Sequence, residues 1–220
     1  MIKLHYYPST ASMAPHILLR ELGAPFELVL VDRTQNAQKM TGYLRLNPNG
    51  LIPVLTDGEL VLYESAAICL HLCDMHPAAG LAPAVGTPER AQFYKWLMWL
   101  TNTLQATLIV YFYPERWVKV GNDGGALEVK TQAALKIGLL LDQLDAELAR
   151  QALRHAAPWL LGASYSAVDA YTLMLCRWTR HFESRPASAR AHLGPYLQRM
   201  LARPAVSETF DAEGLTQPWV

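Results

Sequence analysis

Three hydroxyl side chains, Ser9, Thr10 and Ser12, follow the first apolar stretch of the chain. They lie between an alternating segment, residues 2–6, and an apolar run at helical spacing, so we expect them in a strand-to-helix turn. The first amides of a helix lack partners and carry the positive end of its dipole, so such a turn can stabilise an anion. For a thiol of pKa near 8.5, a downward shift of about two units corresponds to roughly 2.7 kcal/mol. The same residues also fit an ordinary helix cap, with Ser12 as the N-cap.

A second candidate anion site begins at Glu64 and Ser65, which precede an apolar helical run that ends before Pro77. The free amides at the start of that helix would suit a carboxylate. Glu64 could pair with an ammonium group on the same ligand. The alternative is an unremarkable helix cap.

Ser166 and Asp169 have the spacing of a capping-box variant, in which each residue bonds the other's backbone amide at the start of a helix. Asp169 is therefore expected to be structural and not a catalytic acid. Losing the Ser166 cap should cost about 1 kcal/mol.

Other chemistry-bearing patterns are missing from the sequence. Cys69, Cys73 and Cys176 have no zinc-ligand or Cys-x-x-Cys spacing, so we expect reduced, buried thiols. The seven histidines are scattered, and no metal site is expected. Nucleotide-binding and zinc-peptidase functions are excluded because Gly-x-Gly-x-x-Gly, Gly-Lys-Ser/Thr and His-Glu-x-x-His do not occur.

Composition narrows the class of protein further. The chain has 220 residues, of which 51% are hydrophobic, and its 19 Lys and Arg balance 19 Asp and Glu. A chain of this size can bury a self-supporting core, and zero net charge gives no field to gather nucleic acid or anionic lipid. The sequence has no secretory signal and no apolar stretch of the roughly 18 residues that a membrane span needs. A cytoplasmic protein that binds neither nucleic acid nor membrane is expected.

The secondary structure predicted to position these residues differs between the two halves of the chain. In residues 1–76, the pattern predicts strands over 2–6, 26–31, 52–55 and 60–62, the last two joined by a hairpin centred on Asp57-Gly58. Helices are predicted from Ser12 to Gly23 and after Ser65, and the polar stretch 32–45 fits a loop with a short helix around Lys39 to Leu46. The Pro- and Gly-rich residues 77–88 indicate a linker. Residues 89–220 are predicted to be all helical, with long helices over 89–113 and 127–154 and others beginning near 166, 193 and 204.

Taken together, these motifs resemble the cytosolic glutathione S-transferases, and most closely their bacterial beta-class and related members. The resemblance covers nearly the whole chain. It lies in Lys3-Leu-His-Tyr-Tyr-Pro8, Ser12-Met-Ala-Pro-His16, Asn47-Pro-Asn-Gly-Leu-Ile-Pro-Val-Leu55, Glu64-Ser65 and Leu161-Gly162 to Asp169-Ala-Tyr171. It implies an α/β thioredoxin-like first domain, an all-α second domain and a homodimer.

The resemblance also implies roles for single residues. Pro53 is similar to the family's cis-proline, which leaves the Ile52 backbone free to pair with the cysteinyl part of glutathione. Glu64 and Ser65 resemble the pair that holds the γ-glutamyl end. Gln105 stands where beta-class members often have a histidine that reaches glutathione, and it could donate a hydrogen bond without titrating.

One departure bears on the mechanism, because Ala11 stands where beta-class enzymes carry a cysteine. Chemistry through a mixed disulfide with that cysteine is therefore not expected. Serine-type transferases use a nearby hydroxyl instead, and the alignment points to Thr10, with Ser9 and Ser12 left open as neighbours.

The implied reaction is attack of the glutathione thiolate on a small hydrophobic electrophile bound between the domains. Candidate residues of that pocket form an aromatic-rich set: Trp99, Thr103, Tyr111, Tyr113 and Trp117. These side chains fit bundle core or a dimer interface equally well. Two other functions stay open, namely a non-catalytic module that binds glutathione, hydrophobic ligands or other proteins, and a glutathione-dependent peroxidase or reductase.

Overall fold

The computed structural model describes residues 1–220 and contains one four-stranded sheet and nine α-helices. The strands are β1 (Ile2–Tyr6), β2 (Phe26–Leu30), β3 (Val54–Asp57) and β4 (Leu60–Tyr63). The helices are α1 (Met13–Glu21), α2 (Thr41–Leu44), α3 (Ser65–Met75), α4 (Pro88–Trp99), α5 (Ala106–Phe112), α6 (Asp123–Ala152), α7 (Ala167–Arg177), α8 (Leu193–Leu201) and α9 (Pro204–Ala212). The predicted succession of an α/β half and an all-α half is confirmed.

The sheet has the order β2-β1-β3-β4, with β1 parallel to β2 and both other pairs antiparallel. The hairpin turn is one residue later than predicted, because Asp57 still pairs with Leu60 and leaves Gly58 and Glu59 in the turn. β3 also begins at Val54 and not at Ile52. Proline has no amide hydrogen for the ladder, so Pro53 and the residue before it stay outside the sheet.

The helical half shows two differences from the predicted boundaries. The stretch predicted as one helix is interrupted by a π-helix, Leu100–Gln105, between α4 and α5. α6 begins earlier than predicted, because the Asn122 side chain accepts a hydrogen bond from the Gly125 amide at 3.0 Å. A side chain at position 125 would collide with the Asn122 amide, so the glycines that suggested an interruption allow the cap.

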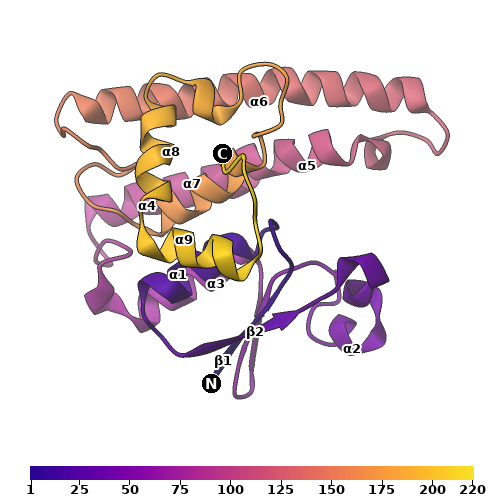
Figure 1. Ribbon diagram of the computed structural model, residues 1–220, viewed down its shortest axis with the longest axis horizontal. Coiled ribbons are helices and arrows are strands. Elements are labelled where there is room, and N and C mark those ends of the chain that lie inside the picture. The colour runs from indigo at the N-terminus through magenta and orange to yellow at the C-terminus, as the bar shows by residue number, and fades with distance from the viewer.

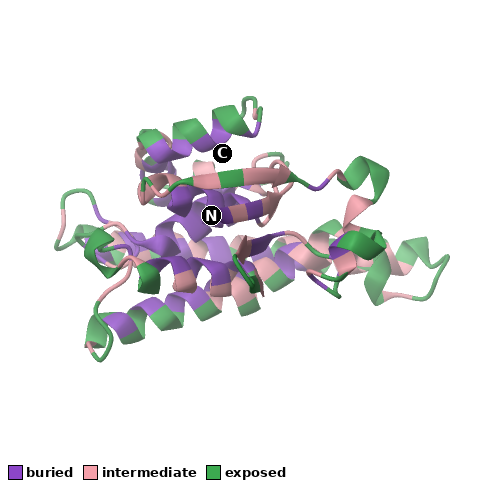
Figure 2. Ribbon diagram, turned by 90° about the horizontal axis from the view of Figure 1, so that it is seen from below, coloured by how far each residue is buried: buried purple, intermediate pink, exposed green.

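The two halves share one hydrophobic core of 40 buried residues. α7 lies at its centre, and all of its residues are buried. α1 packs against α7 and α9, so the first helix of the α/β half is covered by the last helix of the chain (Figure 1). Figure 2 shows the buried segments where the helices meet the sheet. None of the helices is both long and apolar enough to cross a membrane.

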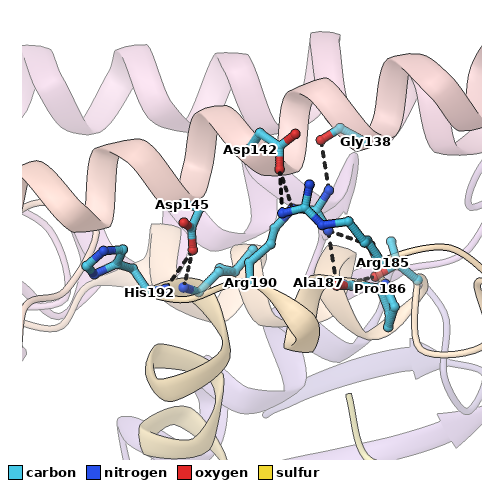
Figure 3. Close-up of polar contacts among 10 residues, drawn as sticks. Gly138, Asp142, Asp145, Arg185, Pro186, Ala187, Arg190 and His192 are labelled. Carbon is cyan, nitrogen blue, oxygen red and sulfur yellow. Dashed lines mark hydrogen bonds and ion pairs between the residues drawn. The ribbon is translucent and has the colours of Figure 1, made fainter.

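The long helix α6 is fastened to the segment that leads into α8 by two acidic side chains (Figure 3). Asp145 Oδ1 accepts the backbone amides of His192 and Leu193, each at 2.7 Å. Arg190, almost fully buried, donates to Asp142 Oδ1 at 2.9 Å and to the Gly138 carbonyl at 2.9 Å. These contacts fix the start of α8 against α6.

Candidate functional site

The turn between β1 and α1 is held together by its own hydroxyls. Thr10 Oγ1 and Ser12 Oγ both donate to the carbonyl of Tyr7, at 2.7 and 3.1 Å, and lie 3.0 Å from each other. Ser12 occupies the N-cap position of α1, but its side chain makes no capping bond there. It is fully buried, whereas Ser9 and Thr10 are partly exposed. Ser12 therefore supports the turn from within, and the expectation that its side chain caps α1 is wrong.

Ser9 is fixed by a residue from the other end of the chain. Its backbone lies in the left-handed region, with φ of 61°, which few non-glycine residues adopt. Its amide donates to Glu213 Oε2 at 2.8 Å, and the other carboxylate oxygen lies 2.9 Å from Nδ1 of His16 on α1. Both side chains of the Glu213–His16 pair are fully buried. The turn thus has its conformation set partly by the segment that follows α9.

The amides that follow Ser9 are unused. None of the backbone–backbone hydrogen bonds of the chain uses the amides of Thr10, Ala11 or Ser12 as donors. The first amide at this end of α1 that donates within the backbone is Met13, to Thr10 O at 3.1 Å. An anion near this turn would therefore meet free N–H groups at a helix start.

The loop before β3 presents the backbone of Ile52. The carbonyl of the preceding residue, Leu51, accepts hydrogen bonds from Tyr43 Oη and Asn47 Nδ2, each at 2.8 Å. The Ile52–Pro53 peptide bond is cis, and neither the amide nor the carbonyl of Ile52 takes part in a backbone–backbone hydrogen bond. Both groups can therefore pair with an extended ligand strand.

A third group of free donors lies at the N-terminus of α3. The amides of residues 65–67 have no backbone acceptor, since Ile68 is the first to donate, to Glu64 O at 3.0 Å. Glu64 has φ of 72° and Ser65 is buried. A carboxylate at the helix start and an ammonium group beside Glu64 would both be stabilised here.

A cavity of about 870 Å³ opens beside this helix start, between α3 and the helical half. Its lining includes Glu64, Ser65, Gln105, Trp117 and Tyr171, together with residues of α5 and α6. Gln105 ends the π-helix, and its Oε1 accepts a hydrogen bond from Tyr171 Oη at 2.5 Å. Four of the residues singled out from the sequence therefore meet around one cavity.

The five predicted pocket residues are not brought together. Of these, only Trp117 borders the 870 Å³ cavity, while Trp99 borders a separate one of about 360 Å³ with Trp96, between α4 and α6. The Thr103 carbonyl accepts a hydrogen bond from the Thr107 hydroxyl at 2.7 Å.

Two of those residues take other partners near the end of α5. The Tyr111 ring packs on Phe182 at 4.4 Å. The Tyr113 hydroxyl accepts a hydrogen bond from Arg33 at 3.2 Å. Since Arg33 also lies 5.7 Å over the Tyr7 ring, Tyr113 approaches the β1–α1 turn from the helical half.

Asp169 lies away from these groups, in the core. With Ser166 it forms a capping box at the start of α7, and Oδ2 accepts the Ser166 amide at 2.8 Å. Oδ1 accepts the Leu160 amide and the Tyr196 hydroxyl, each at 2.9 Å. Burial raises the pKa of this carboxyl, although its hydrogen bonds oppose the shift. No group of three or more His, Cys, Asp or Glu side chains is gathered as metal ligands would be.

Comparison with known proteins decides the family. Residues 8–75 match the family model of the glutathione S-transferase N-terminal domain. Glutathione S-transferase GST-4.5 of Xanthomonas campestris pv. campestris is 31% identical over 214 residues, which cover 97% of this chain and 100% of that protein. The chain belongs to the glutathione S-transferase family.

Solved glutathione S-transferases have the same fold. A bacterial beta-class enzyme of Sphingomonas chungbukensis is 33% identical, with a TM-score of 0.80 over 97% of this chain and 100% of that chain. A glutathione transferase homologue from Sulfitobacter, solved with bound glutathione, is 25% identical, with a TM-score of 0.86 over 98% and 99%. The thioredoxin-like and all-helical architecture, and the family resemblance drawn from the sequence, are confirmed.

Sequence reasoning missed three residues of this glutathione S-transferase that touch the site residues. Tyr171 lies in the quoted Asp-Ala-Tyr motif, so the motif itself pointed to it. Arg33 and Glu213 had no local signal, because their partners Tyr113 and Ser9 are distant in sequence.

Proposed function

We propose that this chain is an enzyme that binds glutathione, stabilises its thiolate and transfers the sulfur to a small hydrophobic electrophile. The proposal rests on three sets of backbone groups that have no partner in the backbone: the amides of the β1–α1 turn, the amide and carbonyl of Ile52, and the first amides of α3. A tripeptide with a thiol on its middle residue and both an ammonium and a carboxylate group at its γ-glutamyl end has chemistry that matches these groups.

In the proposed complex, the cysteinyl backbone of glutathione pairs with Ile52 beside Pro53. The γ-glutamyl carboxylate lies on the amides of Ser65 and the residue after it, and the ammonium group lies beside Glu64. Gln105 Nε2 donates from the opposite wall of the cavity, because Oε1 already accepts from Tyr171.

The thiol sulfur is proposed to lie against the β1–α1 turn. Thr10 Oγ1, partly exposed, and the free amides of Ala11 and Ser12 favour the thiolate over the thiol. The proton leaves to solvent, the sulfur lone pair forms the new C–S bond, and the leaving group departs with its bonding electrons. Because position 11 is alanine, no enzyme thiol takes part in this step.

The electrophile is proposed to bind where the aromatic side chains that follow α5 approach the turn. Tyr113 is already joined to the α/β half by Arg33, and Trp117, which is 62% exposed, borders the cavity. Such a surface suits flat apolar substrates.

The proposal is tested by measuring the thiol pKa of glutathione bound to the protein. Saturating protein should lower the thiol pKa by about two units, seen as ultraviolet thiolate absorbance near neutral pH. Thr10→Ala should raise that pKa, and Thr10→Ser should restore it because the hydroxyl is retained. Ser9→Ala serves as the matched control on the same turn, and Ser12→Ala tests the buried neighbour. If the thiol pKa is unchanged in all of these variants, the backbone amides and not the hydroxyls stabilise the thiolate.

A bound ligand with an unshifted thiol would refute thiolate stabilisation. Binding of glutathione without conjugation of a panel of electrophiles would favour the non-catalytic module.

We also propose that the protein forms a homodimer. Met75 on α3 and Tyr94 and Met98 on α4 are 40–46% exposed, which is high for large apolar side chains. Sedimentation velocity would test this, and a monomer at all accessible concentrations would refute it.

A further inference from the structure

Tyr171 is a core residue with one polar atom at the candidate site. It lies on α7, its side chain is 1% exposed, and the ring packs within the shared hydrophobic core. The residue nevertheless borders the 870 Å³ cavity, and its hydroxyl donates to Gln105 Oε1 at 2.5 Å. A buried phenol with a short hydrogen bond to a cavity-lining amide calls for an explanation beyond packing.

That hydrogen bond decides which end of the Gln105 amide is available. A glutamine amide has an accepting oxygen and a donating NH2 group of nearly equal shape, so packing alone does not choose between them. The Tyr171 hydroxyl donates to the oxygen, and Gln105 Nε2 makes no hydrogen bond within the chain. Two N–H donors of Gln105 therefore remain for a ligand.

The orientation of the Gln105 amide matters because the facing wall of the cavity also presents hydrogen-bond donors. The free amides at the start of α3 lie at Ser65 and Ala66, which line the same cavity. An acceptor at position 105 would repel the carboxylate that these amides attract, whereas an NH2 group adds to the attraction.

We propose that Tyr171 is a positioning residue for glutathione: its hydroxyl holds the Gln105 amide with Nε2 toward the ligand carboxylate at the α3 N-terminus. Tyr171 itself touches no reacting atom. The inference rests on the proposed function, because it requires that glutathione occupies this cavity.

The experiment is a double-mutant cycle on glutathione affinity, measured by calorimetry with Tyr171→Phe, Gln105→Ala and the double variant. Tyr171→Phe removes one oxygen atom and keeps the ring. Each single change should weaken binding by about tenfold, the worth of a hydrogen bond to a charged group. The double variant should be no weaker than Gln105→Ala alone, because Tyr171 acts only through that amide. kcat at saturating glutathione should be unchanged in Tyr171→Phe, while KM for glutathione rises.

The matched control is Tyr196→Phe. Tyr196 is equally buried and donates to a carboxylate, Asp169, but does not border the cavity. This variant should lose thermal stability without losing affinity for glutathione.

A variant that leaves Tyr171 in place gives an independent test. In Gln105→Glu the hydroxyl can still donate to one oxygen, which leaves a charged acceptor facing the ligand, so binding should be weaker than in Gln105→Ala.

The outcomes separate the two proposals. If the wild-type protein binds no glutathione, the proposed function fails. If it binds but Tyr171→Phe binds equally well, or if the losses of the two single variants add, the positioning role is refuted. Equal affinities for Gln105→Glu and Gln105→Ala would also refute it.

Discussion

Replacing Glu213 by alanine should destabilise the whole chain and disturb the β1–α1 turn in particular. The carboxylate is fully buried and has two partners, the Ser9 amide at 2.8 Å and His16 Nδ1 at 2.9 Å. Hydrogen bonds to a charged group contribute about 1.5–3 kcal/mol each. Because His16 would be left buried without its partner and the partly exposed Ser9 amide would lose its acceptor, the expected loss in the free energy of unfolding is about 3–5 kcal/mol. Urea unfolding measured with intrinsic tryptophan fluorescence would quantify it.

The matched control is Glu21→Ala, which breaks another tie between α1 and the end of the chain. Glu21 accepts hydrogen bonds from Nε and Nη2 of Arg203, at 2.6 and 2.8 Å, but these side chains are 12% and 28% exposed. Water can replace part of that interaction, so the expected loss is about 1–2 kcal/mol. The Glu21 pair does not reach the turn, so the thiol pKa of bound glutathione should be unchanged. In Glu213→Ala that pKa should rise, because Ser9 is released from its left-handed conformation.

Two results would contradict this reasoning. A loss of less than about 1 kcal/mol in Glu213→Ala would mean that the buried carboxylate is not an energetic anchor. A large loss with an unchanged thiol pKa would mean that the turn keeps its shape without Glu213.

Three further predictions follow from buried groups elsewhere. Gly50→Ala should cost at least about 1 kcal/mol in urea unfolding and weaken glutathione binding, because φ is +60° and a Cβ would lie 2.8 Å from the Gln38 carbonyl. Burial raises the pKa of Cys73 and of Cys176 to about 12, so mass spectrometry should find neither alkylated by iodoacetamide at pH 8 in the folded protein. Unfolded thiols ionise near pH 9, so the unfolded chain loses these protons first and stability should fall as pH rises above that value. Asp169→Ala should lower the free energy of unfolding, measured with denaturant, by about 3–5 kcal/mol, since two buried amides and the Tyr196 hydroxyl would lose their acceptor. Detectable alkylation at pH 8 would refute the argument about the thiols. An unchanged free energy of unfolding in Gly50→Ala or Asp169→Ala would refute the argument for that variant.

Local signals in the sequence predicted the elements that carry the site. The alternation of residues 2–6 gives β1, with Ile2 and Leu4 buried on one face. The turn signal at residues 47–50 leads to the loop before β3, and the Asn47 side chain that supplied the signal supports that loop through Leu51 O. These predictions succeed because each depends on residues within a few positions of one another.

The direction of side chains was harder to predict, and the aromatic residues 99–117 illustrate why. A π-helix separates α4 from α5, and each of its turns contains more residues than an α-helical turn. The helical phase beyond it is therefore shifted relative to α4. Trp117 lies beyond α5, in the short 3-10 turn Pro114–Trp117, and it borders a different cavity from Trp99, although a single regular helix was expected from 89 to 113.

The directions of the hydroxyl side chains in the β1–α1 turn were equally hard to predict. Spacing placed Ser9, Thr10 and Ser12 together, and they are together, but it cannot say that Ser12 is turned inward to Tyr7 O. Nor could spacing reveal that Ser9 is held by Glu213, which is 204 positions away. Contacts of that separation depend on how α9 packs on α1, which a periodic pattern does not encode.

The hydrogen bonds of the turn also bear on how the proposed thiolate would be stabilised. Thr10 already donates its single hydroxyl hydrogen to Tyr7 O at 2.7 Å, so it must exchange that bond to donate to sulfur. The net gain from such an exchange is small, because one hydrogen bond replaces another. The amides of Ala11 and Ser12 give up no backbone partner, and they lie at the positive end of α1. On this argument the backbone would supply the larger part of the proposed pKa shift and the Thr10 hydroxyl a smaller part. The proposed thiolate stabilisation would then not depend on a cysteine at position 11, because an amide is present at that position whatever its side chain.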